Sequence, residues 1–494
     1  MFKIAINTKL LALLACLTIG FSSFAQVDGF KVTTDRTVDS SSLESIVGDV
    51  IRLSGAKTSD EKGIALYNYL HTVLFHRAYA CEKQPQSVGP LKVINVYGWG
   101  LCGGEHTVMK AVFETAGWPV RYRGWSDPGH TTVEANYDGR WHYFDVFLKA
   151  YFWTKDKKTI AGQDDIVADP SIVLDGEKDG RVPKESFLCC GDDAPGIVQG
   201  CKHSKAEATS KHEDGWASVT GRDQGYSPLL NLRSGSALKL EWTAMPGMMV
   251  ADNTDGKHSC PNMKDIRNNS LLGPIFEHYG TRSYSNGTFT YSPDFTKDAD
   301  IADIELAGAK ASGGKLTATS GAGSAIFKLN LPYAYASAKI DAAFDGGEGK
   351  ISISTDGGKS WKPASAPDAT VQVRQHYDVW VKAEFPGTLN KFNFEATVEH
   401  NRGALPFLYN GKNVVTVSTA DNKLPANSVL TVTYAYQEAA APLKRNQYNG
   451  QGVKYGEIKT VTKEANALPF TFEIEAGGTT PPKMLYIERA LKAK

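Results

Sequence analysis

One cysteine, one histidine and one aspartate in the first third of the chain have the types and surroundings that nucleophilic catalysis requires. Cys102 follows a glycine-rich stretch and precedes residues with helical spacing, His130 begins an alternating stretch, and Asp145 lies near the end of the next one. Cysteine chemistry needs a thiolate, a base beside it, and a group that orients the base. These three residues are therefore the candidate nucleophile, base and orienting carboxylate.

The surroundings of Cys102 favour a thiolate. We expect a helix over residues 102–116, which places Cys102 in the first turn, where the helix dipole and the backbone N–H groups stabilise negative charge. The neighbouring Gly100 and Gly103 let a substrate approach the backbone closely. The same N–H groups are candidates for an oxyanion hole. Trp99 and Asn95 are candidates for a second donor.

Two alternating stretches, residues 130–137 and 141–147, predict a β-hairpin that turns at Asp138-Gly139. Because paired strands bring residues from both arms together, the hairpin can place the imidazole of His130 beside a carboxylate. Such a carboxylate fixes the tautomer of the imidazole.

Successive side chains on a strand point to opposite faces. Asp145 therefore shares a face with Tyr143, whereas His142 points the other way. For this reason we prefer Asp145 to Asp138 as the carboxylate, and His130 to His142 as the base. Tyr143 is a further candidate for contact with the substrate.

Four short motifs around these residues occur in a fixed order. They are Gly100-Leu101-Cys102-Gly103-Gly104, then Ala116-Gly117-Trp118-Pro119-Val120-Arg121, then His130-Thr131-Thr132-Val133-Glu134, and then Trp141-His142-Tyr143-Phe144-Asp145. This string resembles the core of the transglutaminase-like superfamily, which includes transglutaminases, peptide N-glycanases and many bacterial secreted proteins. The resemblance covers roughly residues 60–155.

The resemblance implies a papain-like fold and a triad in which Cys102 is the nucleophile, His130 the base and Asp145 the orienting group. It does not fix the reaction, because relatives hydrolyse peptide or amide bonds, transfer amines to glutamine, release N-glycans, or have lost catalysis. Thr131 departs from the pattern, since the residue after the family histidine is commonly aromatic. Thr131 therefore puts family-specific substrate contacts in doubt.

Other patterns indicate the elements that position these residues. Thr58 and Glu61 form a capping box before apolar residues at helical spacing, which predicts a helix through about residue 74. Residues 120–125 alternate as a strand, after a helix exit at Gly117 and Pro119. The first region is thus an α+β domain, residues 26–165.

The second half of the chain is predicted to be almost entirely strands. Short alternating runs separated by Gly, Asp and Asn include Ala325 to Leu331, Lys350 to Ser354, Val379 to Phe385 and Val414 to Ser418. Their spacing favours an all-β region of one or two β-sandwiches over residues 275–494, folding apart from the first domain and contributing binding. Residues 354–361 match the Asp-box hairpin of secreted β-proteins, which is a folding device. Residues 166–274 are expected to be an irregular, cysteine-containing connection.

The N-terminus indicates export. Residues 1–25 combine lysines, an apolar run and a small-residue cleavage site, as a signal peptide does. We expect a secreted or periplasmic protein, with lipidation at Cys16 the less favoured alternative, and no membrane span. Export permits disulfides, so Cys189, Cys190, Cys201 and Cys260 are expected to form two bridges, while Cys102 stays reduced. A zinc site from three of these cysteines and His203 is the alternative.

Charge and ligand spacing narrow the function classes. The 54 basic and 54 acidic residues balance, which gives no indication of nucleic acid binding.

Glu105 and His106 follow Cys102, and His106, four residues after Cys102 on the expected helix, suggests a metal cluster. The other ligand spacings do not fit a metal, so we interpret this pair as solvated or supporting. We expect no metal and no cofactor.

The sequence thus favours a secreted, cysteine-dependent acyl-transfer enzyme, a hydrolase or transferase acting on an amide or peptide. The substrate is expected to be a peptide, a glycopeptide or a polysaccharide. One alternative is a carbohydrate-active enzyme, a lyase or dehydratase, in which His130 or a tyrosine (Tyr143 or Tyr122) moves protons and Cys102 is not covalent. The other is an inert protein that binds a glycan or a cell surface through its β-domains.

Overall fold

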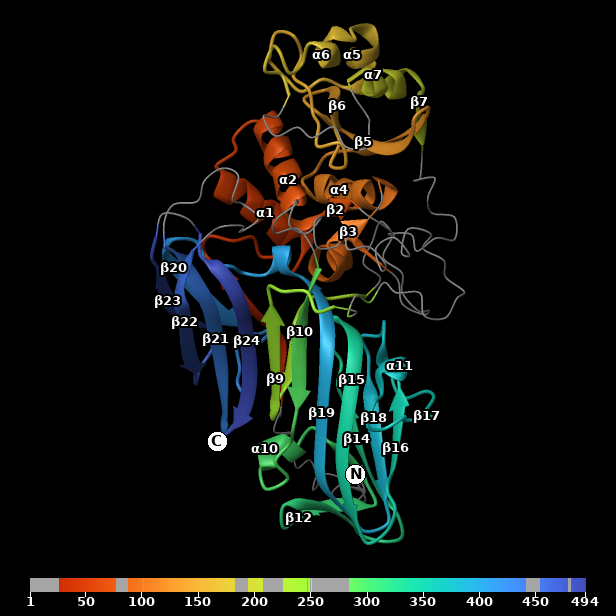
Figure 1. Cartoon of the computed structure of the whole chain (residues 1–494), viewed down its shortest axis with the longest axis vertical. Helices are drawn as coiled ribbons and strands as arrows, with labels where there is room; N and C mark the ends of the chain where they lie inside the picture. Colours follow the sequence, from red (N-terminus) through yellow and green to blue (C-terminus); the bar gives the residue numbers. More distant parts are fainter. Residues whose placement is uncertain are drawn as a thin grey trace, which may run out of the picture.

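The computed structural model describes most of the chain beyond residue 25 (Figure 1). The described ranges are 26–76, 88–100, 102–182, 194–207, 225–246, 248, 250, 284–440, 454–478 and 481–494. The expected signal peptide, Cys81, Cys189, Cys190 and Cys260 lie outside these ranges. Where the structure is described, a mixed region of helices and strands is followed by a largely β region with a curled antiparallel sheet.

Local signals set the helices of the first region. Helix α1 (Leu43–Ser54) begins at Ser42, whose side chain accepts a hydrogen bond from Ser45 N, and it ends at Gly55, where φ is 69°. Helix α2 (Ser59–Val73) has the predicted capping box of Thr58 and Glu61. Short α3 (Pro90–Lys92) and η1 (Val93–Tyr97) lead to α4 (Cys102–Thr115), which is the helix expected after Cys102. A parallel pair, β2 (Phe75–His76) and β3 (Trp99–Gly100), precedes α4.

A four-stranded antiparallel sheet in the order β6-β5-β4-β7 carries the predicted hairpin. Its strands are β4 (Val120–Ser126), β5 (Gly129–Tyr137), β6 (Arg140–Phe144) and β7 (Ser204–Glu207). The turn residues Asp138 and Gly139 have φ of 51° and 77°, as a tight hairpin turn requires. The hairpin therefore forms where the sequence predicts it.

The two faces of this sheet contribute to different cores. Val133 and Phe144 pack into the main core with α4, whereas Trp125 and Tyr143 belong to a second buried cluster. Three short helices and the segment between β6 and the first of them supply the rest of the second cluster. The helices are α5 (Gln163–Ala168), α6 (Ser171–Leu174) and α7 (Ala194–Lys202), which lie at the end of the molecule farthest from the β region (Figure 1).

Most later strands belong to a nine-stranded antiparallel sheet (Figure 1). In spatial order its main path contains β12 (Ala309–Ser312), β13 (Lys315–Ala318), β19 (Thr388–Asn401), β10 (Tyr284–Tyr291), β9 (Ser236–Glu241), β24 (Lys483–Ala493), β21 (Ser428–Ala439) and β22 (Tyr455–Ala465). The remaining strand, β15 (Ala334–Asp345), pairs with β19 off this path. Short helices α10 (Asp298–Ile301), α11 (Thr370–Val373) and η3 (Arg402–Ala404) connect strands.

A five-stranded sheet contains the predicted Asp-box turn. Its strands are β11 (Glu305–Ala307), β14 (Gly323–Lys328), β18 (Trp380–Phe385), β16 (Lys350–Ser354) and β17 (Lys362–Pro363), in that order. Between β16 and β17, Asp356 Oδ1 accepts hydrogen bonds from the Ser354 hydroxyl at 2.7 Å and Ser360 N at 2.9 Å. These bonds close the turn on itself, in agreement with a folding role.

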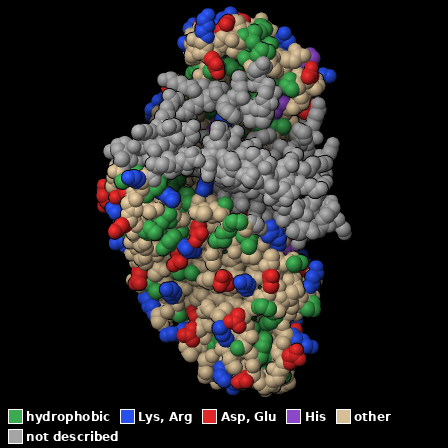
Figure 2. All heavy atoms as spheres, in the orientation of Figure 1, with side chains coloured by type: hydrophobic (Ala, Val, Ile, Leu, Met, Phe, Trp, Pro, Cys, Tyr) green, Lys and Arg blue, Asp and Glu red, His purple; other side chains and the backbone are tan. Residues whose placement is uncertain are grey.

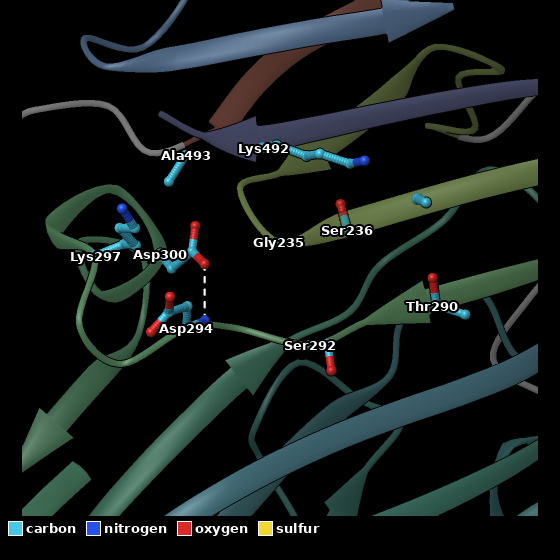
Figure 3. Close-up of a pocket in the computed structure, with 10 residues that line it drawn as sticks. Gly235, Ser236, Thr290, Ser292, Asp294, Lys297, Asp300, Lys492 and Ala493 are labelled. Atoms are coloured by element: carbon cyan, nitrogen blue, oxygen red, sulfur yellow. Dashed lines mark hydrogen bonds between the residues drawn. The ribbon is translucent and has the colours of Figure 1, made fainter. Parts of the chain in front are cut away.

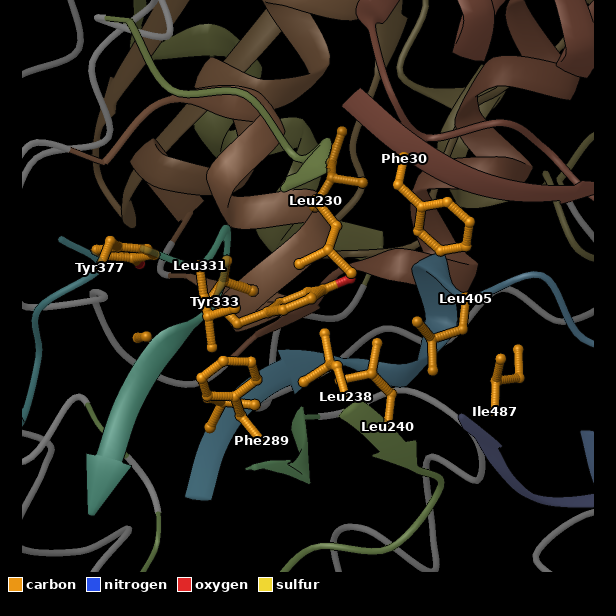
Figure 4. Close-up of a cluster of buried hydrophobic side chains, with 14 of the residues drawn as sticks. Phe30, Leu230, Leu238, Leu240, Phe289, Leu331, Tyr333, Tyr377, Leu405 and Ile487 are labelled. Carbon is orange, nitrogen blue, oxygen red and sulfur yellow. The ribbon is translucent and has the colours of Figure 1, made fainter. Parts of the chain in front are cut away.

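The first described strand belongs to the β region. Strand β1 (Gln26–Thr34) lies between β20 (Gly411–Ser418) and β8 (Leu230–Arg233), and β23 (Phe470–Ala476) completes this sheet. Leu238 and Leu240 on β9 join Phe30 and Phe289 in one buried cluster (Figure 4). Strands from both sides of residue 275 therefore share sheets and a core.

Asn401, at the end of β19, ties the β region to the helices. Its side chain is fully buried, and its Nδ2 donates to Val73 O at 2.8 Å and to Ile94 O at 2.7 Å. Both carbonyls lie at the ends of helical segments, where they need partners. None of the helices in the described ranges is long and apolar enough to cross a membrane.

Candidate active site

Cys102 occupies the first position of α4 and is partly exposed, and its thiol is reduced. The fourteen-residue helix directs its N-terminal backbone N–H groups and the positive end of its dipole at this position. Gly103 and Gly104 follow within the first turn, so no side chain of theirs blocks the approach to the backbone. The predicted placement of the cysteine at a helix start is therefore present.

His130 and Asp145 lie side by side at the end of the hairpin sheet. His130 is the second residue of β5, and Asp145 follows directly after β6. The imidazole Nε2 and Asp145 Oδ2 are 2.7 Å apart, and both side chains are buried. The carboxylate predicted from strand alternation is thus the one that contacts His130.

Three donors converge on the Asp145 carboxylate. Oδ2 accepts from His130 Nε2 and, at 2.8 Å, from the Tyr143 hydroxyl, while Oδ1 accepts from Leu148 N at 2.7 Å. Burial alone would raise the pKa of Asp145, but the charges of His130 and His106 and these hydrogen bonds hold it well below its usual range. Asp145 is therefore ionised and fixed in orientation.

The surroundings of His130 favour its charged form. Burial lowers its pKa, but the Asp145 charge and hydrogen bond, together with a hydrogen bond and charge from Cys102, raise the pKa to about 10. Because Nε2 faces Asp145, Nδ1 is the nitrogen left for the thiol. The rings of Trp125 and Phe147 lie edge-on to the imidazole, with centroids 5.1 and 5.2 Å away, and restrict its rotation.

His106 is a fourth polar group at this site. It is fully buried, its Nδ1 is 2.7 Å from Cys102 O, and its Nε2 is 3.6 Å from Asp145 Oδ1. Glu105 is buried as well, at 2% exposure. The expectation of a solvated pair was wrong, because this face of α4 packs against the hairpin sheet. The alternative of a supporting role stays open.

The same cluster has the composition of a metal site. His106, His130 and Asp145 each offer one ligand atom, and these atoms lie within 4.8 Å of one another. The helical spacing of Cys102 and His106 was the sequence signal for this cluster. The contact of His106 with His130 and Asp145 was not predicted, because it forms only when the hairpin sheet packs on α4.

The other candidates from the sequence have structural surroundings. Asn95 is buried, its Nδ2 donates to Ser40 O and Leu91 O, and its Oδ1 accepts from the Ser40 hydroxyl. Its amide is therefore already committed to backbone and hydroxyl partners. Trp99 lies in β3 by its backbone, and its side chain is outside the description. Tyr143 is fully buried and supports Asp145.

His142 lies on the opposite face from Asp145, as strand alternation predicts. Its ring stacks on Tyr137 with centroids 3.6 Å apart, and both ring nitrogens face backbone carbonyls. Its two nitrogens are therefore occupied away from Cys102. The preference for His130 over His142 agrees with this geometry.

Sequence reasoning missed two supports of the imidazole. Trp125, whose ring contacts His130, donates from Nε1 to Gln163 Oε1 at 3.0 Å, and Gln163 Nε2 donates to the Thr132 hydroxyl at 2.6 Å. Gln163 is fully buried at the start of α5. A buried glutamine leaves no periodic signal in a sequence, so this link became visible only in the fold.

Arg121 and Glu134, which belong to the second and third of the four sequence motifs, are hydrogen-bonded to each other. Arg121 Nε donates to Glu134 Oε2 at 2.9 Å, and Glu134 Oε1 accepts from Gln163 N at 2.7 Å. The carboxylate is fully buried within the sheet. These two motif residues therefore hold neighbouring strands and α5 together beside the site.

The second described cysteine differs from the expectation. Cys201 is a buried, reduced thiol at the end of α7, and burial raises its pKa. The bridge expected at Cys201 is not formed in this structure. The other three cysteines of the expected pair of bridges lie outside the described residues, so their pairing stays a prediction.

A separate cavity of about 310 Å³ lies at the ends of the central strands β9, β10 and β24 of the nine-stranded sheet (Figure 3). Its lining includes Asp300, which accepts hydrogen bonds from the Ser234 hydroxyl and from Asp294 N. These bonds tie adjacent loops together, and Lys297 and Lys492 line the same cavity. The polar groups of this cavity therefore hold neighbouring loops in place, and the residues that line it lie far in sequence from Cys102.

Chemically, the cluster around Cys102 offers a thiol, an imidazole held by a carboxylate, and a helix N-terminus in one place. This combination suits proton transfer and nucleophilic attack on a carbonyl.

Comparisons with known proteins found no match. No family profile, no curated protein and no solved structure resembles this chain to a significant degree.

Proposed function

We propose that this protein is a secreted acyl-transfer enzyme of the transglutaminase-like type, more a hydrolase than a transferase. Cys102 is the nucleophile, His130 the base and Asp145 the orienting carboxylate. The observation that carries the proposal is the buried 2.7 Å pair of His130 and Asp145, whose histidine also hydrogen-bonds Cys102 at a helix start. In this proposal residues 26–165 have a papain-like core, and the later strands have a β-sandwich character.

The proposed reaction begins with the charge distribution of the site. His130 holds the proton and Cys102 the negative charge, so the thiolate attacks an amide carbonyl carbon. The carbonyl oxygen becomes an oxyanion beside the backbone N–H groups of the first turn of α4. His130 then gives its proton to the departing amine, the C–N bond breaks, and a thioester remains on Cys102.

The thioester is released by a second nucleophile. His130, now neutral, accepts a proton from water or from an incoming amine, which attacks the thioester carbon and breaks the C–S bond. Water gives a carboxylic acid, and an amine gives a new amide. Asp145 stabilises the imidazolium in both halves of the cycle without being protonated itself.

The surroundings of the tyrosines favour this reaction over a lyase or dehydratase. Tyr143 is fully buried, donates to Asp145, and has a pKa raised well above its usual value by burial and by Asp145. Tyr122 is 4% exposed, and its hydroxyl is 2.9 Å from the Thr107 hydroxyl. Neither phenol is placed to take a proton from a sugar.

The test is turnover on a panel of peptides, glycopeptides and acidic polysaccharides. We expect Cys102→Ala and His130→Ala each to abolish turnover, because the thiolate and its base act as one unit. Asp145→Asn should keep the fold and cost roughly 10²- to 10⁴-fold in rate. His203→Ala, at an exposed position, is the control and should retain activity. Turnover that survives Cys102→Ala, with new ultraviolet absorbance from an unsaturated sugar, would overturn the proposal in favour of a lyase.

A further inference from the structure

His106 has one ring nitrogen whose role in the triad chemistry is unassigned. Its Nδ1 lies 2.7 Å from the carbonyl oxygen of Cys102, which only accepts hydrogen bonds, so Nδ1 carries a proton. In the neutral ring the lone pair is therefore on Nε2. Among the described residues, this buried Nε2 has no hydrogen-bond partner.

The Nε2 lone pair faces a carboxylate. Asp145 Oδ1 is 3.6 Å away, and both side chains are fully buried. Two electron-rich atoms at this distance repel each other unless a cation lies between them.

We propose that His106, His130 and Asp145 form a binding site for a divalent transition-metal ion of the zinc class. Their ligand atoms lie within 4.8 Å of one another, and the His106–Asp145 separation of 3.6 Å is close to the roughly 3.4 Å between two ligands of a tetrahedral ion. Imidazole nitrogens and a carboxylate are ligands that zinc accepts. The Nδ1–H bond to Cys102 O is the backbone anchor that metal-binding histidines commonly have.

Metal binding at this cluster excludes the proposed chemistry. When the ion binds His130 Nε2, it replaces the proton that His130 shares with Asp145, and that proton leaves to water. With Nε2 bound to the ion and Nδ1 protonated toward Cys102, the imidazole of His130 has no lone pair left and cannot act as the base. The ion thus inhibits the enzyme reversibly, a consequence that rests on the proposed function, whereas the metal binding itself does not.

The first experiment measures metal binding alone. The purified full chain is freed of metal and titrated with Zn²⁺ in competition with a coloured chelator, and with Co²⁺ in a spectrometer. We expect one ion per chain and the intense visible absorption of tetrahedral cobalt. Weak octahedral absorption, or no saturable binding, would overturn the inference without any variant.

Variants then locate the ion. His106→Gln should weaken zinc binding at least about tenfold, whereas His203→Gln, an exposed histidine on the same half of the molecule, should leave it unchanged. If His106→Gln does not fold by circular dichroism, His106→Asn takes its place. Equal zinc affinity in wild type and a folded His106 variant would place the ion elsewhere and contradict the site.

A third measurement separates this inference from the proposed function. Zinc should slow alkylation of Cys102 by iodoacetamide in wild type, and the ratio of rates with and without zinc should approach one in the His106 variant. If zinc binds but Cys102→Ala remains active, the site stands and the proposed function fails. If Cys102→Ala is inactive and zinc does not bind, the function stands and this inference fails.

Discussion

Asp145 organises the site at the level of single residues. Its two oxygens receive an imidazole, a phenol and a backbone N–H, and one of them also faces His106. Each hydrogen bond to a buried charge is worth on the order of 1.5–3 kcal/mol. The carboxylate therefore holds β5, β6 and the chain after β6 together. It also fixes the position of the His130 imidazole.

The two described cysteines should differ strongly in reactivity. Cys102 is partly exposed beside His130, whereas Cys201 is 2% exposed and burial raises its pKa. Because the thiolate is the reactive form, iodoacetamide should label Cys102 at least about tenfold faster than Cys201 in the native protein. Peptide mapping by mass spectrometry over a time course measures both rates in one sample. Faster labelling of Cys201 would contradict the proposed role of Cys102.

The ion pair of His130 and Asp145 should make the free energy of unfolding depend on pH between about 6.5 and 10. The folded-state pKa of His130 is raised to about 10, above the roughly 6.5 of a histidine in an unfolded chain. A raised pKa contributes stability that is complete below about pH 6.5 and is lost as pH rises through about 10. The Tm of wild type should therefore fall across this window relative to that of His130→Gln.

Calorimetry at steps of pH measures this difference. His203→Gln changes an exposed histidine and should follow wild type throughout the window. The lowered pKa of Asp145 contributes stability above the unfolded value of about 3.9, so it stays constant in this range. A Tm difference between wild type and His130→Gln that is independent of pH would show that the pair is not charged as described.

At the scale of elements, the site depends on α7 as much as on the hairpin. Helix α7 packs on β4 through Gly200, which lies against the Trp125 ring, and Trp125 in turn lies edge-on to His130. A Cβ at Gly200 would overlap that ring. The absence of a side chain at Gly200 therefore sets the distance between α7 and the sheet.

Two helix glycines provide a matched test of this packing. Gly200→Ala should destabilise the protein by about 1–3 kcal/mol, because the added methyl overpacks the Trp125 ring. Gly48→Ala, in α1, has open space around its Cβ position and should stabilise by about 0.5–1 kcal/mol through helix propensity. Urea unfolding followed by Trp fluorescence gives both values. A neutral Gly200→Ala would mean that α7 does not pack on Trp125 in this way.

At the scale of the whole molecule, strands from the first half of the chain pair with strands from the second half. Strand β1 pairs with β20, and β9 lies between β10 and β24, so early segments complete the late sheets. Charges of both signs are interspersed over the described part of the face in Figure 2. This mixture agrees with the balanced composition of 54 basic and 54 acidic residues.

A fragment that begins at residue 275 tests whether the later strands need the earlier ones in order to fold. It lacks β1, β8 and β9, so β10, β20 and β24 lose a partner strand each and the shared core is opened. We expect no cooperative unfolding transition from this fragment, in contrast to the full chain. A sharp transition by circular dichroism would instead favour the independent β region that the sequence suggested.

The sequence by itself determined the local structure and the choice of Cys102, His130 and Asp145. The capping box of Thr58 and Glu61 acts over one helical turn, and the Asp138-Gly139 turn needs only its own backbone angles. Strand alternation selected Asp145 in the same way, because the two-residue period is a local property. Patterns that act over a few residues can be identified before the fold is known.

Only the tertiary structure decided which distant segments meet. The burial of His106 against Asp145, the contact of Trp125 with His130 and the pairing of β1 with β20 all join residues that no local period relates. Such contacts form because the fold as a whole buries apolar surface, and many pairings satisfy the same local pattern. The packing of α4 on the sheet makes His106 a buried neighbour of Asp145, which excludes the solvated role and leaves the supporting role that the sequence also suggested.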